Sequence, residues 1–257
     1  MPTISSKRVV ITAGAAGIGR ALALAFHNTG AKVAVCDLDA NAIAELAKIQ
    51  PEIIGHVADV TDPDDMAAFL AAVDHAFGGV DIAIANAGTG GPAGPIEGLD
   101  LKEWQACISA NLDGTFLLCG WAARHMKAQK SGSMILISST AGLFGYPMRS
   151  PYATAKWGVI GLMKTLACEL GSYGVRVNAI CPGAVEGARM ERVLAKEAAA
   201  TAKDVEEVRE IYVKGVSMKT WVSADDIADA AMFLCSPAAS KISGLAMPVD
   251  GHTESIT

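Results

Sequence analysis

The chain has 257 residues and a mass of 26.5 kDa, with 51% hydrophobic and 19% charged residues. This balance excludes a disordered chain and fits one large α/β domain. A formal net charge of -6, without a block of Lys and Arg, argues against nucleic acid as a partner.

Short apolar segments alternate with amphipathic helical patterns, which is typical of a parallel sheet with helices on both faces. The predicted strands are residues 8–12, 32–36, 53–58, 80–85, 133–138, 176–180 and 245–249. Helices are expected to begin near Gly17, Asp39, Asp62, Asp100, Pro151 and Ser223. The predicted fold is therefore a doubly wound, seven-stranded parallel sheet, Rossmann-like, in a single domain over residues 1–257.

The first expected strand leads directly into a glycine-rich loop, residues 12–19, and then into a helix. Backbone amides at a helix N-terminus favour an anion, so a diphosphate would fit here. The alternative is a simple tight turn, because the spacing is not GxGxxG. The second strand ends at Asp37, which can accept hydrogen bonds from an adenosine ribose and would repel a 2′-phosphate. This favours NAD over NADP, although a solvated helix-capping role remains the alternative, more so for Asp39.

Two later segments suggest further organisation. The expected helix 151–171 carries few charges, so it should be apolar on more than one face. We favour a second copy of the chain as its outer cover, in a homodimer or homotetramer. The alternative cover is the preceding long helix, predicted over 100–129.

The irregular segment 184–220 contains helix formers and is a candidate lid over a small molecule.

Tyr152 and Lys156 lie four residues apart on the apolar helix, hence on one face. Lowering a tyrosine pKa from about 10 to between about 7 and 8 requires about 3–4 kcal/mol. An ammonium group ~4 Å away supplies up to about 4 kcal/mol at an effective dielectric constant of about 20. The pair could therefore perform proton transfer, although YxxxK by itself is common by chance.

Several other motifs accompany this pair in a fixed order. They are TAGAAGIG at 12–19, Asp59-Val60, Asn86-Ala87-Gly88, Asn111, Ser139, YATAK at 152–156, Pro182-Gly183 and Val249-Asp250-Gly251. Through these motifs the chain resembles the short-chain dehydrogenase/reductase family over essentially its whole length. The departures are Ala13 in place of the first loop glycine, Gly187 in place of a common threonine, and a DGH ending.

The resemblance implies roles for individual residues. Tyr152 would be the general acid/base, Ser139 would orient the substrate oxygen, and Lys156 would hold the nicotinamide ribose and lower the tyrosine pKa. Asn111 would hold a water in a proton relay. The implied cofactor-binding residues are Gly14, Gly17, Ile18, Gly19, Asp37, Asp59, Val60, Asn86, Ala87, Gly88, Tyr152, Lys156, Pro182, Gly183 and Val185. Among these, Asp59 and Val60 would contact adenine, and the Val185 backbone would meet the carboxamide.

We therefore expect an NAD-dependent oxidoreductase that acts on a secondary alcohol or ketone of a small polar substrate, such as a polyol, sugar derivative or hydroxy acid. The substrate would lie between Ser139, Tyr152, residues 89–95, residues 143–150 and the lid. Charged candidates there are Arg149, Glu186 and Arg189, with solvated surface charges as the alternative.

Two other functions remain open. One is an NADPH-dependent 3-oxoacyl-carrier reductase, against which Asp37 and the lack of a basic residue at Ala15 or Ala16 count. The other is a non-catalytic NAD-binding sensor, which would have no need of Ser139 and Tyr152.

Six scattered cysteines without a CxxC pair indicate a reducing, cytoplasmic location, and the histidine spacing predicts no metal site. No membrane segment is expected.

Overall fold

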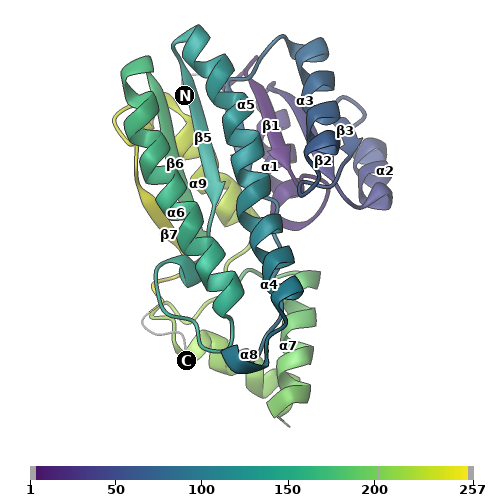
Figure 1. The fold of residues 1–257 in the computed structure, drawn as a ribbon, viewed down its shortest axis with the longest axis vertical. Helices are drawn as coiled ribbons and strands as arrows, with labels where there is room; N and C mark the ends of the chain where they lie inside the picture. Colours follow the sequence, from purple (N-terminus) through teal and green to yellow (C-terminus); the bar gives the residue numbers. More distant parts are fainter. Residues whose placement is uncertain (1–3, 202, 254–257) are drawn as a thin grey trace.

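The computed structural model describes residues 4–201 and 203–253, apart from the side chains of 189, 196, 197 and 199–201. Within them a parallel sheet of seven strands forms the centre, in the order β3-β2-β1-β4-β5-β6-β7 (Figure 1). The strands are β1 Arg8–Thr12, β2 Lys32–Asp37, β3 Ile54–Val57, β4 Ile82–Ala85, β5 Gly132–Ile137, β6 Val175–Pro182 and β7 Ala246–Val249. The predicted sheet is confirmed, and its order reverses between β1 and β4, where ligands bind in such folds.

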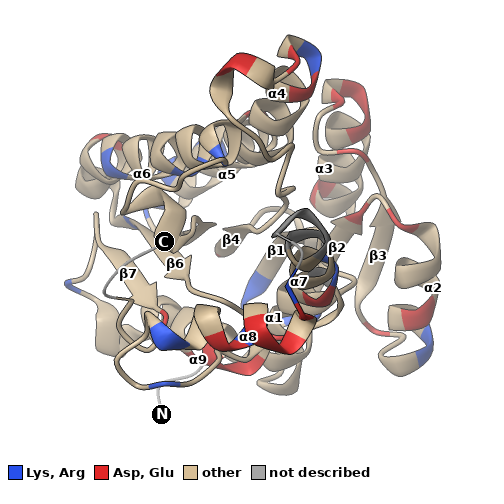
Figure 2. Cartoon of the chain, turned by 90° about the horizontal axis from the view of Figure 1, so that it is seen from below, with Lys and Arg blue, Asp and Glu red and all other residues tan. Residues whose placement is uncertain are grey.

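Helices cover both faces of this sheet (Figure 2). Their bounds are α1 Gly17–Asn28, α2 Ala40–Ile49, α3 Pro63–Phe77, α4 Leu101–Ile108, α5 Gly114–Gln129, α6 Ser150–Leu170, α7 Ala188–Thr201, α8 Val205–Lys214 and α9 Ala224–Cys235. The side chains of Asp39, Asp62, Asp100 and Ser223 accept hydrogen bonds from backbone amides at the predicted helix starts. These short polar side chains satisfy amides that have no partner within the helix.

The strands are apolar throughout because both of their faces are buried. Val9 and Ile11 pack in the core that includes α1, α2 and α9, whereas Val10 between them packs in the core that includes α3, α5 and α6. Side chains alternate across a strand, so a run of apolar residues supplies both cores at once. This double burial explains why the strands read as continuous hydrophobic segments.

The chain is helical without a break from Leu101 to Gln129, as predicted for 100–129, but a π-helical turn interrupts the regular α-helical geometry. Helix α4 ends at Ile108, a π-helical turn follows over Ser109–Asp113, and α5 then begins at Gly114. The side-chain amide of Asn111 donates to the Cys107 carbonyl oxygen at 2.8 Å, the oxygen that a regular α-helix pairs with the backbone amide of Asn111. Such π turns often mark functional positions.

The outer side of α5 and α6 keeps large aromatic side chains in solvent. Phe116 is 61% exposed and Trp157 is 51% exposed. The chain therefore covers this apolar surface only in part, and the homo-oligomer stays a prediction.

The segment predicted as a lid folds largely into α7 and α8, which lie beyond the C-terminal ends of the strands (Figure 1). Leu194, Ala198 and Val208 form a small hydrophobic cluster between the two helices. Arg209 on α8 also pairs with Glu191 on α7 at 2.6 Å. The two helices thus hold together as a unit distinct from the sheet cores.

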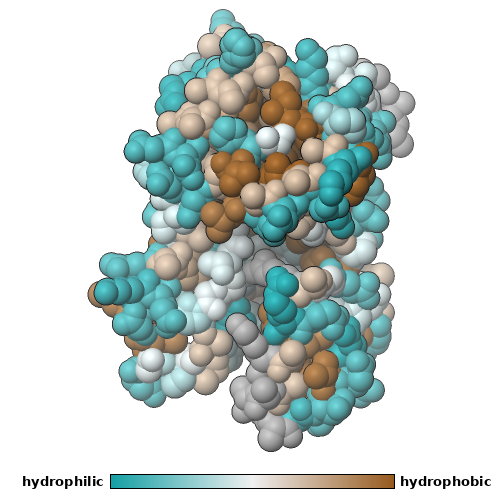
Figure 3. Space-filling view, turned by 90° about the vertical axis from the view of Figure 1, so that its right-hand side faces the viewer, coloured by the Kyte–Doolittle hydropathy of each residue, from teal (hydrophilic) through white to brown (hydrophobic). Residues whose placement is uncertain are grey.

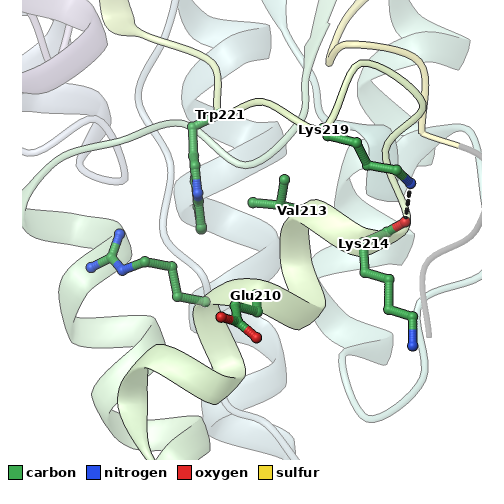
Figure 4. Close-up of a pocket in the computed structure, with 6 residues that line it drawn as sticks. Glu210, Val213, Lys214, Lys219 and Trp221 are labelled. Carbon is green, nitrogen blue, oxygen red and sulfur yellow. Dashed lines mark hydrogen bonds between the residues drawn. The ribbon is translucent and has the colours of Figure 1, made fainter.

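A cavity of about 460 Å³ lies between α8 and residues 219–221 (Figure 4). Its lining residues are Arg209, Glu210, Val213, Lys214, Lys219 and Trp221, and the Lys219 ammonium donates to the Lys214 carbonyl oxygen at 2.6 Å. None of these residues belongs to the predicted catalytic or cofactor set, and all except Trp221 belong to the segment 184–220 that was predicted as a lid.

The β3 edge of the sheet faces the viewer in Figure 3, where hydrophobic side chains gather amid hydrophilic ones. Ile54 and Val57 of β3 are 37% and 49% exposed. This edge strand is only four residues long, so it offers few free backbone groups for pairing with another chain.

Judged by length and hydropathy, none of the helices in the described part of the chain could span a membrane.

Candidate active site

The glycine-rich loop turns tightly between β1 and α1. A Cβ atom on Gly14 would lie 2.5 Å from Val35 Cβ, and one on Gly19 would lie 1.9 Å from the Ala13 carbonyl oxygen. Ala13 itself adopts a left-handed conformation with φ 49°. The turn therefore forms despite the missing first glycine, at a local cost of roughly 1–2 kcal/mol.

The start of α1 can accept an anionic group. Gly17 has φ +50°, and a Cβ atom there would meet nothing within 4 Å. The residue before the helix, Ala16, provides no capping side chain, and the first turn carries no acidic residue. Backbone amides at such a helix start suit a diphosphate, so the loop residues, including the partly buried Ile18, fit a dinucleotide.

Asp37 lies at the C-terminal end of β2, against this loop. Its carboxylate accepts hydrogen bonds from the backbone amides of Ala15 and Asp39, each at 3.1 Å. Asp39 instead caps α2 through the amides of Asn41 and Ala42. The two carboxylates therefore have different roles, and Asp37 retains acceptor capacity beside the loop for a ribose hydroxyl.

The switch point between β1 and β4 is cross-linked by side chains. The Asn86 amide donates to the carbonyl oxygens of Thr12 and Ala13 at 3.1 and 3.0 Å. The Thr12 hydroxyl accepts from the backbone amides of Asn86 and Ala87. Thr12 is missing from the predicted site residues, and its place as the last residue of a central strand was the available signal.

Asp59 and Val60 follow β3 and shape the approach to α3. The Asp59 carboxylate accepts from the amide and the hydroxyl of Thr61, both at 2.8 Å, and its own amide donates to Asp65. Val60 lies against the start of α5, where a Cβ atom on Gly114 would come within 2.9 Å of it. Both residues are partly exposed at the C-terminal edge of the sheet.

The segment after β6 is held in an extended form. The Gly183 amide donates to the Val249 carbonyl oxygen at 3.0 Å, and a Cβ atom on Gly183 would lie 2.7 Å from Asp250 Cβ. Val185 pairs with Val222 as an isolated parallel bridge. The side chain of Glu186 is exposed, whereas that of Arg189 lies outside what the structure describes.

Ser139, Tyr152 and Lys156 meet where β5 ends against α6. All three are buried, with exposed fractions of 8%, 9% and 4%. The Lys156 ammonium donates to the Ile137 carbonyl oxygen at 3.0 Å and lies 5.7 Å from the centre of the Tyr152 ring. The Ser138 hydroxyl donates to the Lys156 carbonyl oxygen at 2.8 Å, which ties β5 to α6. The predicted catalytic side chains therefore share one buried region.

Asn111 approaches the same region from the π turn. Its amide nitrogen donates to the carbonyl oxygens of Thr89 and Cys107, and its buried Oδ1 has no partner among the described residues. A Cβ atom on Gly88 would lie 2.4 Å from Asn111 Oδ1 and 3.2 Å from Lys156 Nζ. The Gly88 backbone therefore passes beside both groups, and a buried acceptor without a partner is a natural seat for a water.

Arg149 lies with its guanidinium beside the Tyr152 ring. Its guanidinium carbon is 5.5 Å from the centre of the Tyr152 ring and 5.6 Å from that of Tyr146. Tyr146 falls within the segment 143–150 that was predicted to surround the substrate, although it was not singled out there. The Tyr146 hydroxyl in turn lies 3.5 Å from the Tyr212 hydroxyl on α8.

Four of the cysteines offer no ready thiolate. Burial raises the pKa of Cys36, Cys119 and Cys235 to about 12 each, and that of Cys181 to about 11. These four thiols therefore stay protonated near neutral pH.

Comparison with known proteins gives matches over nearly the whole chain. A family model described as Enoyl-(Acyl carrier protein) reductase matches residues 13–252. D-beta-hydroxybutyrate dehydrogenase of Rhizobium meliloti (strain 1021) is 33% identical over 255 residues, which cover 96% of this chain and 98% of that protein.

Two solved structures extend this similarity to the fold. An NAD+-bound xylitol dehydrogenase has a TM-score of 0.91 at 26% identity, with 96% of this chain and 98% of that chain covered. An actinorhodin polyketide ketoreductase with NADPH has a TM-score of 0.92 at 28% identity, with 98% of both chains covered. These two neighbours differ in the cofactor that they hold.

Proposed function

The chain belongs to the short-chain dehydrogenase/reductase family, and on that premise we propose that it transfers hydride between NAD and a secondary alcohol or ketone of a small polar substrate. Members of this family are oxidoreductases that act on hydroxyl and ketone groups with a nicotinamide cofactor. The observation that carries the proposal is the shared buried region of Ser139, Tyr152, Lys156 and Asn111.

We propose that the described loops hold the dinucleotide. Gly14, Gly17, Ile18 and Gly19 would cradle the diphosphate at the start of α1, and Asp37 would accept from the adenosine ribose. Asp59, Val60, Asn86, Ala87 and Gly88 would line the adenine and ribose side, and Pro182, Gly183 and Val185 the nicotinamide side. When bound, the nicotinamide supplies or accepts the hydride.

In the proposed mechanism the protein handles the proton. Tyr152 would donate its hydroxyl proton to the ketone oxygen in reduction and accept it from the alcohol in oxidation. Ser139 would hold the same oxygen by a hydrogen bond from its hydroxyl. The Lys156 ammonium would stabilise the tyrosinate, which favours proton transfer near neutral pH. Asn111 Oδ1 would hold a water that exchanges protons with Lys156.

The cofactor preference follows from charge. A 2′-phosphate would meet the Asp37 carboxylate beside the loop, where Ala15 and Ala16 provide no cation to offset the repulsion. A second candidate, an NADPH-dependent 3-oxoacyl-carrier reductase, draws support from the NADPH-bound neighbour and from a 3-oxoacyl-[acyl-carrier-protein] reductase of Thermotoga maritima, which is 30% identical over 252 residues. We favour NAD because Asp37 is a feature of this chain itself.

The segment 184–220 would act as a lid. Helices α7 and α8 lie beyond the C-terminal ends of the strands, and Tyr212 reaches Tyr146 next to the proposed catalytic residues. A closing lid would exclude water during hydride transfer.

Tyr152→Phe tests the chemistry. It removes the proton donor and retains the ring, so kcat/KM for a secondary-alcohol panel should fall by roughly 100- to 10,000-fold. Affinity for NADH, followed by fluorescence, should change by no more than about fivefold, since a hydroxyl hydrogen bond contributes about 1 kcal/mol. Tyr173→Phe, at a surface tyrosine that is 40% exposed, is the matched control. Turnover of Tyr152→Phe at the rate of this control would refute the assignment of Tyr152 as the acid/base. NADH binding without turnover of any substrate by the wild type would instead favour a non-catalytic NAD sensor.

A further inference from the structure

Arg149 is a cation at the proposed active site for which no acidic partner is found among residues 4–201 and 203–253. Its Nη2 donates to the Gly90 carbonyl oxygen at 2.8 Å, and its buried Nε has no hydrogen-bond partner. A guanidinium has five N–H donors, so one neutral acceptor leaves most of its capacity unused.

Two aromatic rings fix the position of this cation. The guanidinium carbon lies 5.5 Å from the ring centre of Tyr152 and 5.6 Å from that of Tyr146. Cation–π attraction to both rings orients the group without a carboxylate from the protein. The backbone supports the arrangement, because the Gly94 amide donates to the Met148 carbonyl oxygen at 2.8 Å.

Arg149 lies beside the residue that is proposed to act at the reacting carbon of the substrate. Tyr152 is the proposed proton donor to the substrate oxygen, and Arg149 contacts the ring of that same tyrosine. A guanidinium binds a carboxylate through two parallel hydrogen bonds, with more geometric specificity than an ammonium. A substrate with a carboxylate a few bonds from its carbinol carbon would place both groups correctly.

We propose that Arg149 binds the carboxylate of the substrate and selects a short hydroxy acid, or the matching oxo acid, over a neutral alcohol. This inference rests on the proposed function and names its substrate class. Arg149 is then a specificity-determining residue, whereas Ser139 and Tyr152 act on the substrate oxygen.

The test compares acids with neutral counterparts of nearly the same shape. The acids are 2-hydroxybutanoate, 3-hydroxybutanoate and 4-hydroxypentanoate, and the counterparts are 1,2-butanediol, 1,3-butanediol and 1,4-pentanediol. In Arg149→Met, kcat/KM for the preferred acid should fall by about 10- to 100-fold, mainly through KM, because a hydrogen bond to a charged group is lost. The value for the matching diol should stay within about threefold of the wild type.

Two further variants make the comparison specific. Arg149→Lys should restore part of the preference for the acid, since it keeps the charge and loses the two-bond geometry. Arg124→Met removes an exposed arginine from α5 and should leave both substrates unaffected. Equal losses for acid and diol in Arg149→Met, with a shifted pH profile, would overturn the proposal, because Arg149 would then act on Tyr152 and not on the substrate.

A binding measurement separates this inference from the proposed function. Calorimetry of each acid with the enzyme–NADH complex requires no turnover. Tighter binding to the wild type than to Arg149→Met, by about tenfold, supports the carboxylate site even if no alcohol of the panel is oxidised with NAD. Oxidation of the diols, with no acid bound more tightly by the wild type than by Arg149→Met, would overturn the carboxylate site and leave the proposed oxidoreductase intact.

Discussion

Asp37→Asn is the sharpest test of the proposed cofactor preference. The substitution removes the negative charge beside the glycine-rich loop and changes the side chain by one atom. One oxygen acceptor remains, so the side chain can keep one of its hydrogen bonds from the amides of Ala15 and Asp39, each 3.1 Å long in the wild type. The fold of the loop should therefore survive while the electrostatics change.

The expected change in cofactor preference follows from the charge of the 2′-phosphate and the exposure of Asp37. A 2′-phosphate carries a charge of about -1.5 to -2 near neutral pH. Two unit charges 4 Å apart repel by about 1 kcal/mol in water and by about 4 kcal/mol near a protein surface. Asp37 is partly exposed, so removing its charge should improve NADP use by about 1–3 kcal/mol, or roughly 5- to 150-fold. NAD should lose about 1 kcal/mol, because a charged acceptor for the ribose becomes neutral.

The assay is the ratio of kcat/KM with NAD+ to kcat/KM with NADP+, using one substrate. In Asp37→Asn this ratio should fall at least about tenfold below that of the wild type. Asp39→Asn is the matched control, because Asp39 caps α2 and asparagine is an equally good capping residue. An unchanged ratio in Asp37→Asn, or an equal change in both variants, would refute a direct contact between Asp37 and the ribose.

Two further predictions concern stability and the loop. Burial by itself would raise the pKa of Asp81, but three hydrogen bonds from Arg8 and its positive charge hold that pKa below its usual value. Asp81→Asn should therefore lower the free energy of unfolding by about 1–3 kcal/mol at about pH 7. The ionised carboxylate stabilises the fold fully above its unfolded pKa of about 3.9. The difference in unfolding free energy between wild type and Asp81→Asn should therefore shrink as the pH falls through the lowered folded pKa. Urea unfolding that shows an undiminished difference at about pH 2 would contradict this explanation. Gly19→Ala should abolish NADH binding, because its Cβ atom would lie 1.9 Å from the Ala13 carbonyl oxygen, whereas at Gly17 a Cβ atom meets nothing within 4 Å. Gly17→Ala should cost only about 1–2 kcal/mol of stability, and equal NADH affinities in fluorescence titrations of the two variants would contradict the argument.

The helix starts and the strands could be predicted because their causes are local. Asp62 and Ser223 each accept hydrogen bonds from amides two or three residues ahead, so the capping residue and the helix start are neighbours in the sequence. Tyr152 and Lys156 share a face for the same reason, since one turn of helix separates them. The two-sided apolar strands likewise indicated a sheet covered on both faces.

Other features of the site depend on packing between distant segments. Asn111 was predicted within a long regular helix, and it lies in a π-helical turn of that helix, beside Gly88. In that turn the Asn111 side chain donates to the carbonyl oxygens of both Thr89 and Cys107, a contact that spans two elements. Helical periodicity contains no signal for such a contact.

The sequence by itself determined the fold class, the one-turn spacing of Tyr152 and Lys156, and the acidic end of β2, because each depends on neighbours within a few residues. Only the tertiary structure decided that Ala13 adopts a left-handed turn and that the Arg149 guanidinium lies close to two tyrosine rings. Arg149 donates to the Gly90 carbonyl oxygen, 59 residues away. Such contacts arise when the strand order brings separate loops to one edge of the sheet, and no local pattern encodes that meeting.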